Sequence, residues 1–70
     1  MNIVLTSHVL EKIERRKLVK QEVIDAVKQP DNITKKYGKY YYQKKIDRGT
    51  IEIPCEVTET YIKVITVYWT

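Results

Sequence analysis

The fold of this chain is decided by the stretch Thr50-Ile51-Glu52-Ile53-Pro54-Cys55-Glu56-Val57-Thr58, in which apolar and polar residues alternate. Side chains of a strand point alternately to its two faces, so every second residue of 51–57 is predicted to share one apolar face. Such a strand buries one face against a core and leaves the other to solvent. Because Pro54 has no N–H to donate to a neighbouring strand, we expect this strand to lie at a sheet edge or to bulge there.

Three further strands are predicted around this stretch. Residues 33–37 and 40–46 have strand character, and turns follow them at Gly38-Lys39 and Asp47-Arg48-Gly49. Residues 61–68 are apolar on both faces, as expected of a central strand. The connections are short enough for hairpins, so these strands are expected to form an antiparallel meander.

The N-terminal part of the chain predicts two short helices. Thr6 or Ser7 is a suitable N-cap for the first, which runs to about Arg16. The second runs over residues 20–28 and ends before Pro30. Residues 3–5 are a short first strand or a packed lead-in.

These elements together predict a single α+β domain over residues 1–70. Its N-terminal helical hairpin is expected to pack on a curled antiparallel sheet of three to four strands. The predicted core between them consists of Ile3, Val4, Leu10, Ile13, Val23, Ile24, Val27, Ile53, Cys55, Val57 and Val64.

Charge and composition restrict the function. The net charge is +4, and residues 35–50 alone hold six basic residues against Asp47. This excess favours a polyanion such as RNA as partner, while simple solubility of an exposed hairpin is the alternative. The single cysteine, Cys55, excludes an intramolecular disulfide, and no metal site or cofactor motif is visible. No membrane span or signal peptide is visible either, so a cytoplasmic location is expected.

One face of the first predicted helix carries basic residues. His8, Lys12 and Arg15 are spaced to form one stripe, and Arg16 falls between that stripe and the apolar face. A capping or surface role for His8, and an ion pair between Arg16 and a helical glutamate, are the alternatives.

The stretch Tyr40-Tyr41-Tyr42-Gln43-Lys44-Lys45 places tyrosine beside lysine on both faces of a strand. This pattern suits stacking on bases with contacts to phosphates, and it equally suits a strand whose lysines discourage edge-to-edge association. Metal-independent RNA cleavage needs a base, cations at the phosphate and a proton donor. His8 suits the acid or base, Arg16 and Lys44 the phosphate contacts, and Tyr42 a donor or stacking ring. The candidate nucleic-acid-binding residues are Lys12, Arg15, Lys35, Lys36, Lys39, Lys45 and Arg48.

Several of these stretches resemble domain-of-unknown-function family 4258. The resemblance is carried by residues 6–16 (Thr-Ser-His-Val-Leu-Glu-Lys-Ile-Glu-Arg-Arg), by Tyr42-Gln43-Lys44 and by residues 64–68 (Val-Ile-Thr-Val-Tyr). Val9 stands where the family usually has Ala, and Lys17-Leu18-Val19 replaces its usual Gly-Ile-Ser, so the second helix lacks its usual N-cap.

That family is similar to the RelE/ParE-like toxin superfamily, whose small basic members pack a helical hairpin on an antiparallel sheet. The resemblance implies a toxin-like protein that cleaves RNA, free or on the ribosome, and is paired with a protein antitoxin. A non-catalytic module that binds nucleic acid or protein is the alternative function. By position, the resemblance marks His8, Arg16, Tyr42, Lys44 and Thr66 as catalytic. We further expect the Arg16 guanidinium to lie near Tyr40, Tyr42, Lys44, Thr66 or Tyr68.

Overall fold

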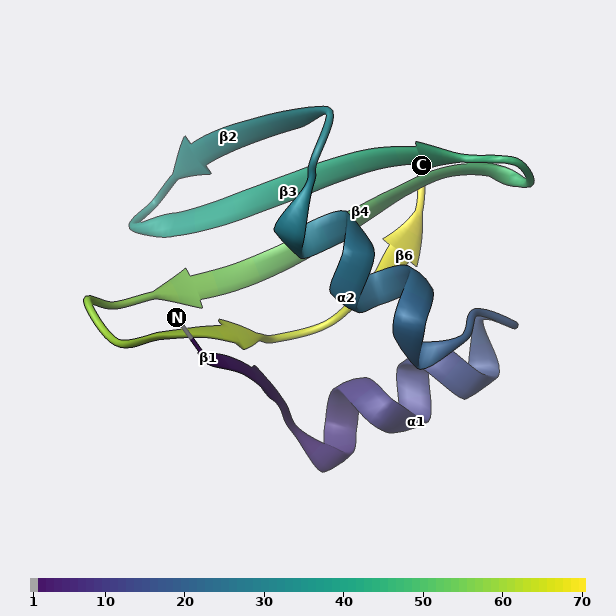
Figure 1. Cartoon of the computed structure of the whole chain (residues 1–70), viewed down its shortest axis with the longest axis horizontal. Coiled ribbons are helices and arrows are strands. Elements are labelled where there is room, and N and C mark those ends of the chain that lie inside the picture. The colour runs from purple at the N-terminus through teal and green to yellow at the C-terminus, as the bar shows by residue number, and fades with distance from the viewer. Residues whose placement is uncertain (1) are drawn as a thin grey trace.

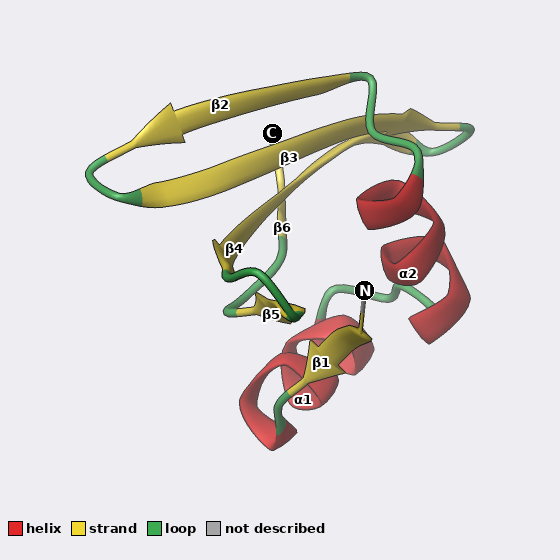
Figure 2. Ribbon diagram, turned by 60° about the vertical axis from the view of Figure 1, so that its left-hand side comes forward, coloured by secondary structure: helices red, strands yellow, loops and turns green. Residues whose placement is uncertain are grey.

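The computed structural model describes residues 2–70, in which six strands form one sheet and two helices cover one of its faces (Figures 1 and 2). Five strands follow the order β1-β5-β4-β3-β2, and β6 also pairs with β4. The elements are β1 (Asn2–Leu5), α1 (Ser7–Arg15), α2 (Lys20–Lys28), β2 (Asn32–Lys36), β3 (Lys39–Ile46), β4 (Gly49–Val57), β5 (Tyr61–Val64) and β6 (Tyr68–Trp69).

The predicted fold class is therefore wrong. The sheet has six strands rather than three or four, it is mixed rather than antiparallel, and it holds more of the chain than the two nine-residue helices. The helices are not an N-terminal unit packed on a separate sheet, because β1 precedes them and pairs in parallel with β5. The register Asn2↔Tyr61 joins two ends of the chain, and hydrophobic periodicity within either segment does not specify such a distant partner.

Strand β4 lies inside the sheet, so the expectation of an edge position is also wrong. It pairs with β3 on one side and with β5 and β6 on the other. Between the pairs Cys55↔Val64 and Glu52↔Tyr68, β4 has two residues, whereas the segment opposite it has the three residues 65–67. The extra residue makes this a bulge. The interruption lies beside Pro54, and it divides the predicted strand 61–68 into β5 and β6.

The proline explains where the ladder is interrupted. The Pro54 carbonyl accepts from the Ile65 N–H at 2.9 Å, so it points toward the β5–β6 side. The N–H and C=O of one strand residue point the same way in an antiparallel ladder, so the missing donor of Pro54 also faces that side. The bulge expected at Pro54 is thus found in the neighbouring strand segment.

The two helices begin with different caps. The Thr6 hydroxyl accepts from the Val9 N–H at 3.2 Å, which satisfies one free donor at the start of α1. Val19 has no capping side chain, and instead its own N–H donates to Glu22 Oε1 at 3.0 Å. Between the helices, Lys17 adopts a left-handed conformation with φ of 60°, which ends α1.

The core lies between the helices and one face of the sheet. Its buried residues are Val9, Ile13, Leu18, Val23, Ala26, Val27, Tyr42, Ile51, Ile53, Cys55, Val64 and Val67. Two residues of the predicted core are exposed instead, because Val4 is 40% and Leu10 42% accessible. Ile3, Ile24 and Val57 are half-buried. The buried stripe of α1 is Val9 and Ile13, one turn apart, so Leu10 faces outward.

Candidate functional site

The face of the sheet opposite the helices carries a chain of hydrogen-bonded polar side chains. Ile51 and Ile53 of β4 are buried in the core, so Glu52 between them points to the other face, and Gln43 of β3 lies directly opposite it. The Gln43 amide nitrogen donates to Glu52 Oε1 at 2.6 Å. We call this uncovered side of the sheet the open face.

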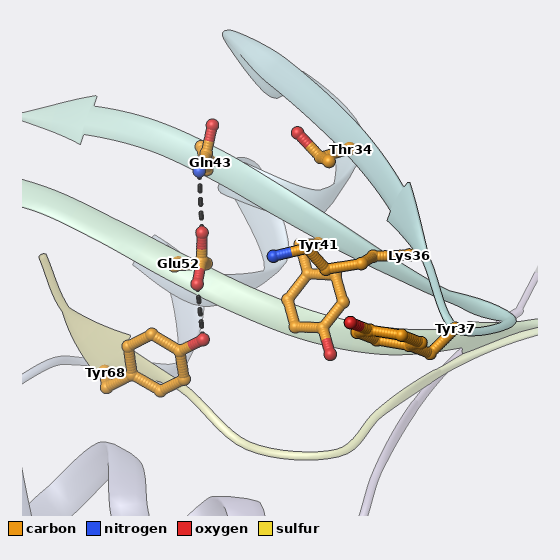
Figure 3. Close-up of a pocket in the computed structure, with 7 residues that line it drawn as sticks. All are labelled: Thr34, Lys36, Tyr37, Tyr41, Gln43, Glu52 and Tyr68. Atoms are coloured by element: carbon orange, nitrogen blue, oxygen red, sulfur yellow. Dashed lines mark hydrogen bonds between the residues drawn. The ribbon is translucent and has the colours of Figure 1, made fainter.

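Two further strands extend this chain. Asn32 Nδ2 of β2 donates to Gln43 Oε1 at 2.8 Å, and the Tyr68 hydroxyl of β6 donates to Glu52 Oε2. Both oxygens of the carboxylate are therefore held by donors from neighbouring strands (Figure 3). Burial and the bond to Glu52 raise the pKa of Tyr68 to about 12, so its hydroxyl remains a donor at neutral pH.

The open face is hollowed around these hydrogen-bonded side chains. The hollow has a volume of about 390 Å³, within the size range of small-molecule sites, and we call it the open-face hollow. Its lining residues are Thr34, Lys36, Tyr37, Tyr41, Gln43, Glu52 and Tyr68, shown in Figure 3.

Tyr37 occupies an unfavourable position at the rim of the hollow. It forms the two-residue turn between β2 and β3 with Gly38, and both have positive φ, 54° and 76°. Glycine and asparagine suit such a turn, whereas a bulky residue in the left-handed region costs about 1–2 kcal/mol. The Tyr37 side chain is also 91% exposed, so neither backbone preference nor burial explains a tyrosine there.

Two lysines next to this turn oppose each other. Lys36 and Lys39 are directly paired across β2 and β3, and neither forms an ion pair within residues 2–70. Like charges directly opposite each other destabilise a strand pair. A bound anion would relieve this repulsion, so the end of the hairpin is suited to a phosphate.

The predicted catalytic residues of the first helix lie away from the open face. His8 is exposed in the first turn of α1, on the helix-covered side of the sheet (Figure 2). Arg16 follows α1 about 12 Å farther along the helix axis. Its carbonyl accepts from Trp69 Nε1 at 2.9 Å, and its buried Nε has no partner among the described residues. Arg16 thus contacts Trp69 through its backbone carbonyl, and the expected place of its guanidinium near the strand side chains stays a prediction.

The strand residues of the predicted catalytic set have different surroundings. Tyr42 is 7% exposed and packs in the core, where burial raises its pKa. Lys44, on the same face of β3, lies 3.4 Å from Asp31 Oδ1 and lines a separate cavity with residues of α2. Thr66 is half-buried in the segment between β5 and β6. No hydrogen bond, ion pair or cavity among the described residues joins two members of the predicted catalytic set.

The predicted nucleic-acid-binding residues divide between the two faces. Lys36, Lys39 and Lys45 share the open face, since each alternates with residues of the opposite face along its strand. Lys35 lies on the other side, 5.4 Å from the centre of the Tyr40 ring.

The remaining predicted basic residues lie elsewhere. Lys12 and Arg15 are on α1, and Arg15 pairs with Glu11 at 2.7 Å. Arg48 donates to both carboxylate oxygens of Glu22, at 2.8 and 2.9 Å, and stacks 5.8 Å from the centre of the Trp69 ring.

Three lining residues of the hollow were not predicted, namely Thr34, Tyr37 and Glu52, and Tyr68 was expected only as a neighbour of Arg16. The alternation of 50–58 already places Glu52 on the polar face, so it had a signal in the sequence. The pairing of Tyr68 with Glu52 had no such signal, because this register depends on the bulge opposite Pro54.

Two general features follow from the described part of the chain. No helix within it is long and apolar enough to cross a membrane. Within the same residues, no three side chains of His, Cys, Asp or Glu come together as a metal site would need.

Comparisons with known proteins identify a family. Neither the curated proteins nor the solved structures contain a match to this chain. Residues 5–69 match the model of the family described as Domain of unknown function (DUF4258). This match spans nearly the whole sequence, including both helices and the strands that build the open-face hollow. The chain therefore belongs to the DUF4258 family.

Proposed function

We propose that this protein binds single-stranded RNA on the open face of its sheet. The observation that carries the proposal is the turn between β2 and β3, where the exposed Tyr37 lies next to the directly opposed lysines Lys36 and Lys39. Both features cost stability in the free protein and both suit a ligand with bases and phosphates. Residues held at such a cost are common at functional sites.

Aromatic rings and cations are arranged in the way single-stranded nucleic acid requires. Tyr37 and Tyr41 line the hollow and offer rings on which unpaired bases stack, and Lys36 lies beside them for a phosphate (Figure 3). Base–aromatic stacking contributes about 1–3 kcal/mol per base. A sheet surface with exposed rings does not enter a duplex groove, so unpaired bases fit it better.

Free hydroxyl groups favour RNA over DNA. The hydroxyls of Thr34, Tyr37 and Tyr41 make no hydrogen bond to another described residue, although all three line the hollow. Each is able to donate to or accept from a ribose 2′-hydroxyl, which is the group that distinguishes RNA from DNA.

Cleavage of RNA by a toxin-like protein with an antitoxin stays a prediction. No hydrogen bond, ion pair or cavity of the described residues joins any two of His8, Arg16, Tyr42, Lys44 and Thr66, so no contact supports the expected acid, base and phosphate roles. Binding requires no such assembly, and the residues that suit it do line one hollow. The alternative function from the sequence, a non-catalytic nucleic-acid-binding module, is therefore the one we propose.

The test uses the adjacent residues Lys35 and Lys36, which have the same charge and lie on opposite faces of β2. Fluorescence anisotropy of a labelled single-stranded RNA at several salt concentrations should show binding that weakens as salt rises. Lys36→Ala should weaken it several-fold and reduce the slope of log K against log salt by about 0.7, the value for one lost phosphate contact. Lys35→Ala should leave both nearly unchanged.

Three further outcomes bear on the proposal. Equal effects of Lys35→Ala and Lys36→Ala, or binding that salt does not affect, would contradict it. Equal affinity for DNA of the same sequence would remove the assignment to RNA. Denaturing electrophoresis of the same RNA after incubation examines cleavage, and loss of cleavage in His8→Ala would revive the catalytic assignment.

A further inference from the structure

From the geometry around Glu52 we infer that the open-face hollow selects guanine among the bases of a bound single-stranded RNA. This inference rests on the proposed function and adds a base preference to it. It starts from an unusual feature of the hollow: a carboxylate lies near the middle of a surface proposed to bind a polyanion. Glu52 is the only acidic residue among the seven that line the hollow.

The carboxylate is held in a fixed orientation. Gln43 donates to one oxygen and Tyr68 to the other, and Asn32 in turn fixes the amide of Gln43. These partners come from strands on both sides of β4, so the Glu52 side chain cannot turn without breaking bonds to β3 and β6. A group held in this way loses little freedom when it binds a ligand.

Glu52 still has capacity for a ligand, but only for one that donates. A carboxylate has about four acceptor positions, and the two protein donors occupy one on each oxygen. One position on each oxygen remains. A phosphate offers no donor and repels the carboxylate, and a ribose 2′-hydroxyl offers only one donor, so a group that fills both positions has to be the edge of a base.

Only guanine presents two adjacent donors on its Watson–Crick edge. Its N1–H and N2 amino group lie side by side and match the two oxygens of a carboxylate. Adenine and cytosine place a ring-nitrogen acceptor next to their amino group, and uracil places carbonyls on both sides of its N–H. Each of these bases would set an acceptor against one Glu52 oxygen, and leaving polar atoms unmatched in this way costs affinity.

The surroundings of Glu52 fit a base in this position. Tyr41 and Tyr68 border the same hollow as Glu52, so a guanine whose edge meets the carboxylate lies next to aromatic rings (Figure 3). Lys36 lines the same hollow beside Tyr41 (Figure 3), so its ammonium is expected to contact the phosphate of the same nucleotide. The volume of about 390 Å³ is in the range of sites that hold one small ligand.

The experiment measures the affinity of short oligouridine RNAs with one central base changed to guanine, adenine, cytosine or inosine. Inosine keeps the N1–H of guanine and lacks its amino group. The wild-type protein should bind the guanine RNA about tenfold or more tightly than the adenine, cytosine and all-uridine RNAs. Its affinity for the inosine RNA should lie between that for the guanine RNA and that for the other three. Glu52→Gln should abolish the preference, because an amide offers one acceptor and one donor.

The matched control is Glu56→Gln. Glu56 lies on the same strand and the same face as Glu52, opposite Lys63, and it does not line the hollow. This variant removes the same charge and should keep the guanine preference. The inosine RNA tests the same contact without changing the protein, so the inference remains testable if Glu52→Gln unfolds.

The outcomes separate the two proposals. Equal binding of all the RNAs, or a guanine preference that survives in a folded Glu52→Gln, would overturn the guanine inference and leave RNA binding standing. An inosine RNA bound as tightly as the guanine RNA would also overturn it. Binding to none of the RNAs would overturn both the proposed function and this inference.

Discussion

Tyr37 shows how a single residue can oppose the stability of its own turn. Its left-handed backbone and its 91% exposed ring are both unfavourable in the free protein. Gly38, the next residue, is the glycine that such a turn favours, with φ of 76° and open space, free of atoms within 4 Å, where a Cβ would lie. The turn thus has one residue that suits it and one that suits a ligand.

We predict that Tyr37→Asn makes the protein more stable and a weaker RNA binder. Asparagine adopts the left-handed conformation more easily, so the free energy of unfolding should rise by about 0.5–1 kcal/mol. Loss of one stacking ring should lower RNA affinity about fivefold or more. Urea denaturation and anisotropy titration measure the two effects. A variant that is less stable and binds equally well would show that the ring serves the fold.

At the residue scale, the sequence predicted some positions and missed others for identifiable reasons. The alternation of 50–58 correctly placed Ile53 and Cys55 in the core and left Glu52 on the opposite face. It did not reveal that Glu52 meets Tyr68, because that pair depends on a bulge between strand segments sixteen residues apart in the chain. Long-range register is set by three-dimensional packing, which local patterns do not contain.

At the scale of elements, the helix bounds were predicted closely and the strand partners were not. α2 spans the predicted residues 20–28, and Thr6 caps α1 as one of the two expected residues. Caps, prolines and periodicity are local signals, and they were sufficient for both helices. The pairing of β1 with β5 and the interior position of β4 arise from contacts between distant segments.

One ion pair fastens the β3–β4 turn to the start of α2. Arg48, one of the two residues of that turn, donates to both oxygens of Glu22 and to the Lys17 carbonyl at 3.3 Å. The next residue, Gly49, has φ of 140°, and a Cβ there would lie 3.3 Å from the Trp69 ring, so the turn fits closely against this side chain. The hydrogen bond from Arg48 is the main cause that holds the pKa of Glu22 below its ordinary value of 4.5.

We predict that this pair contributes to the acid sensitivity of the fold. A carboxyl group whose pKa is lowered on folding stabilises the folded state above its unfolded pKa of 4.5, and this contribution is lost as the pH falls through the lower folded value. Stability measured by urea denaturation should therefore decrease less between neutral and acid pH in Glu22→Gln than in the wild type. Glu14→Gln is the control, since Glu14 is exposed and has no ion pair within the described residues. An unchanged pH dependence in Glu22→Gln would contradict the prediction.

At the scale of the whole molecule, the strands are held very unequally. β4 has partners along both of its edges and most of its residues are buried or half-buried, whereas β2 pairs only with β3 and all five of its residues are exposed. β2 nevertheless supplies Thr34 and Lys36 to the open-face hollow, and Asn32 to the chain that orients Glu52. One wall of the proposed site is therefore built on the strand with the least support.

This arrangement predicts the pattern of amide hydrogen exchange and how RNA changes it. Amides of β2 that bond to β3 should exchange more than about tenfold faster than those in the middle of β4, because a strand held on one side opens locally without unfolding the sheet. A bound RNA contacting Lys36 and Tyr37 favours the closed hairpin, so β2 should gain protection on binding. Amides of α1, on the helix-covered side, should gain little and serve as the internal control. Protection of β2 equal to that of β4 in the free protein would contradict the unequal support of the strands. A gain confined to α1 would instead place the RNA beside His8, on the side of the molecule where the sequence alone had placed the site.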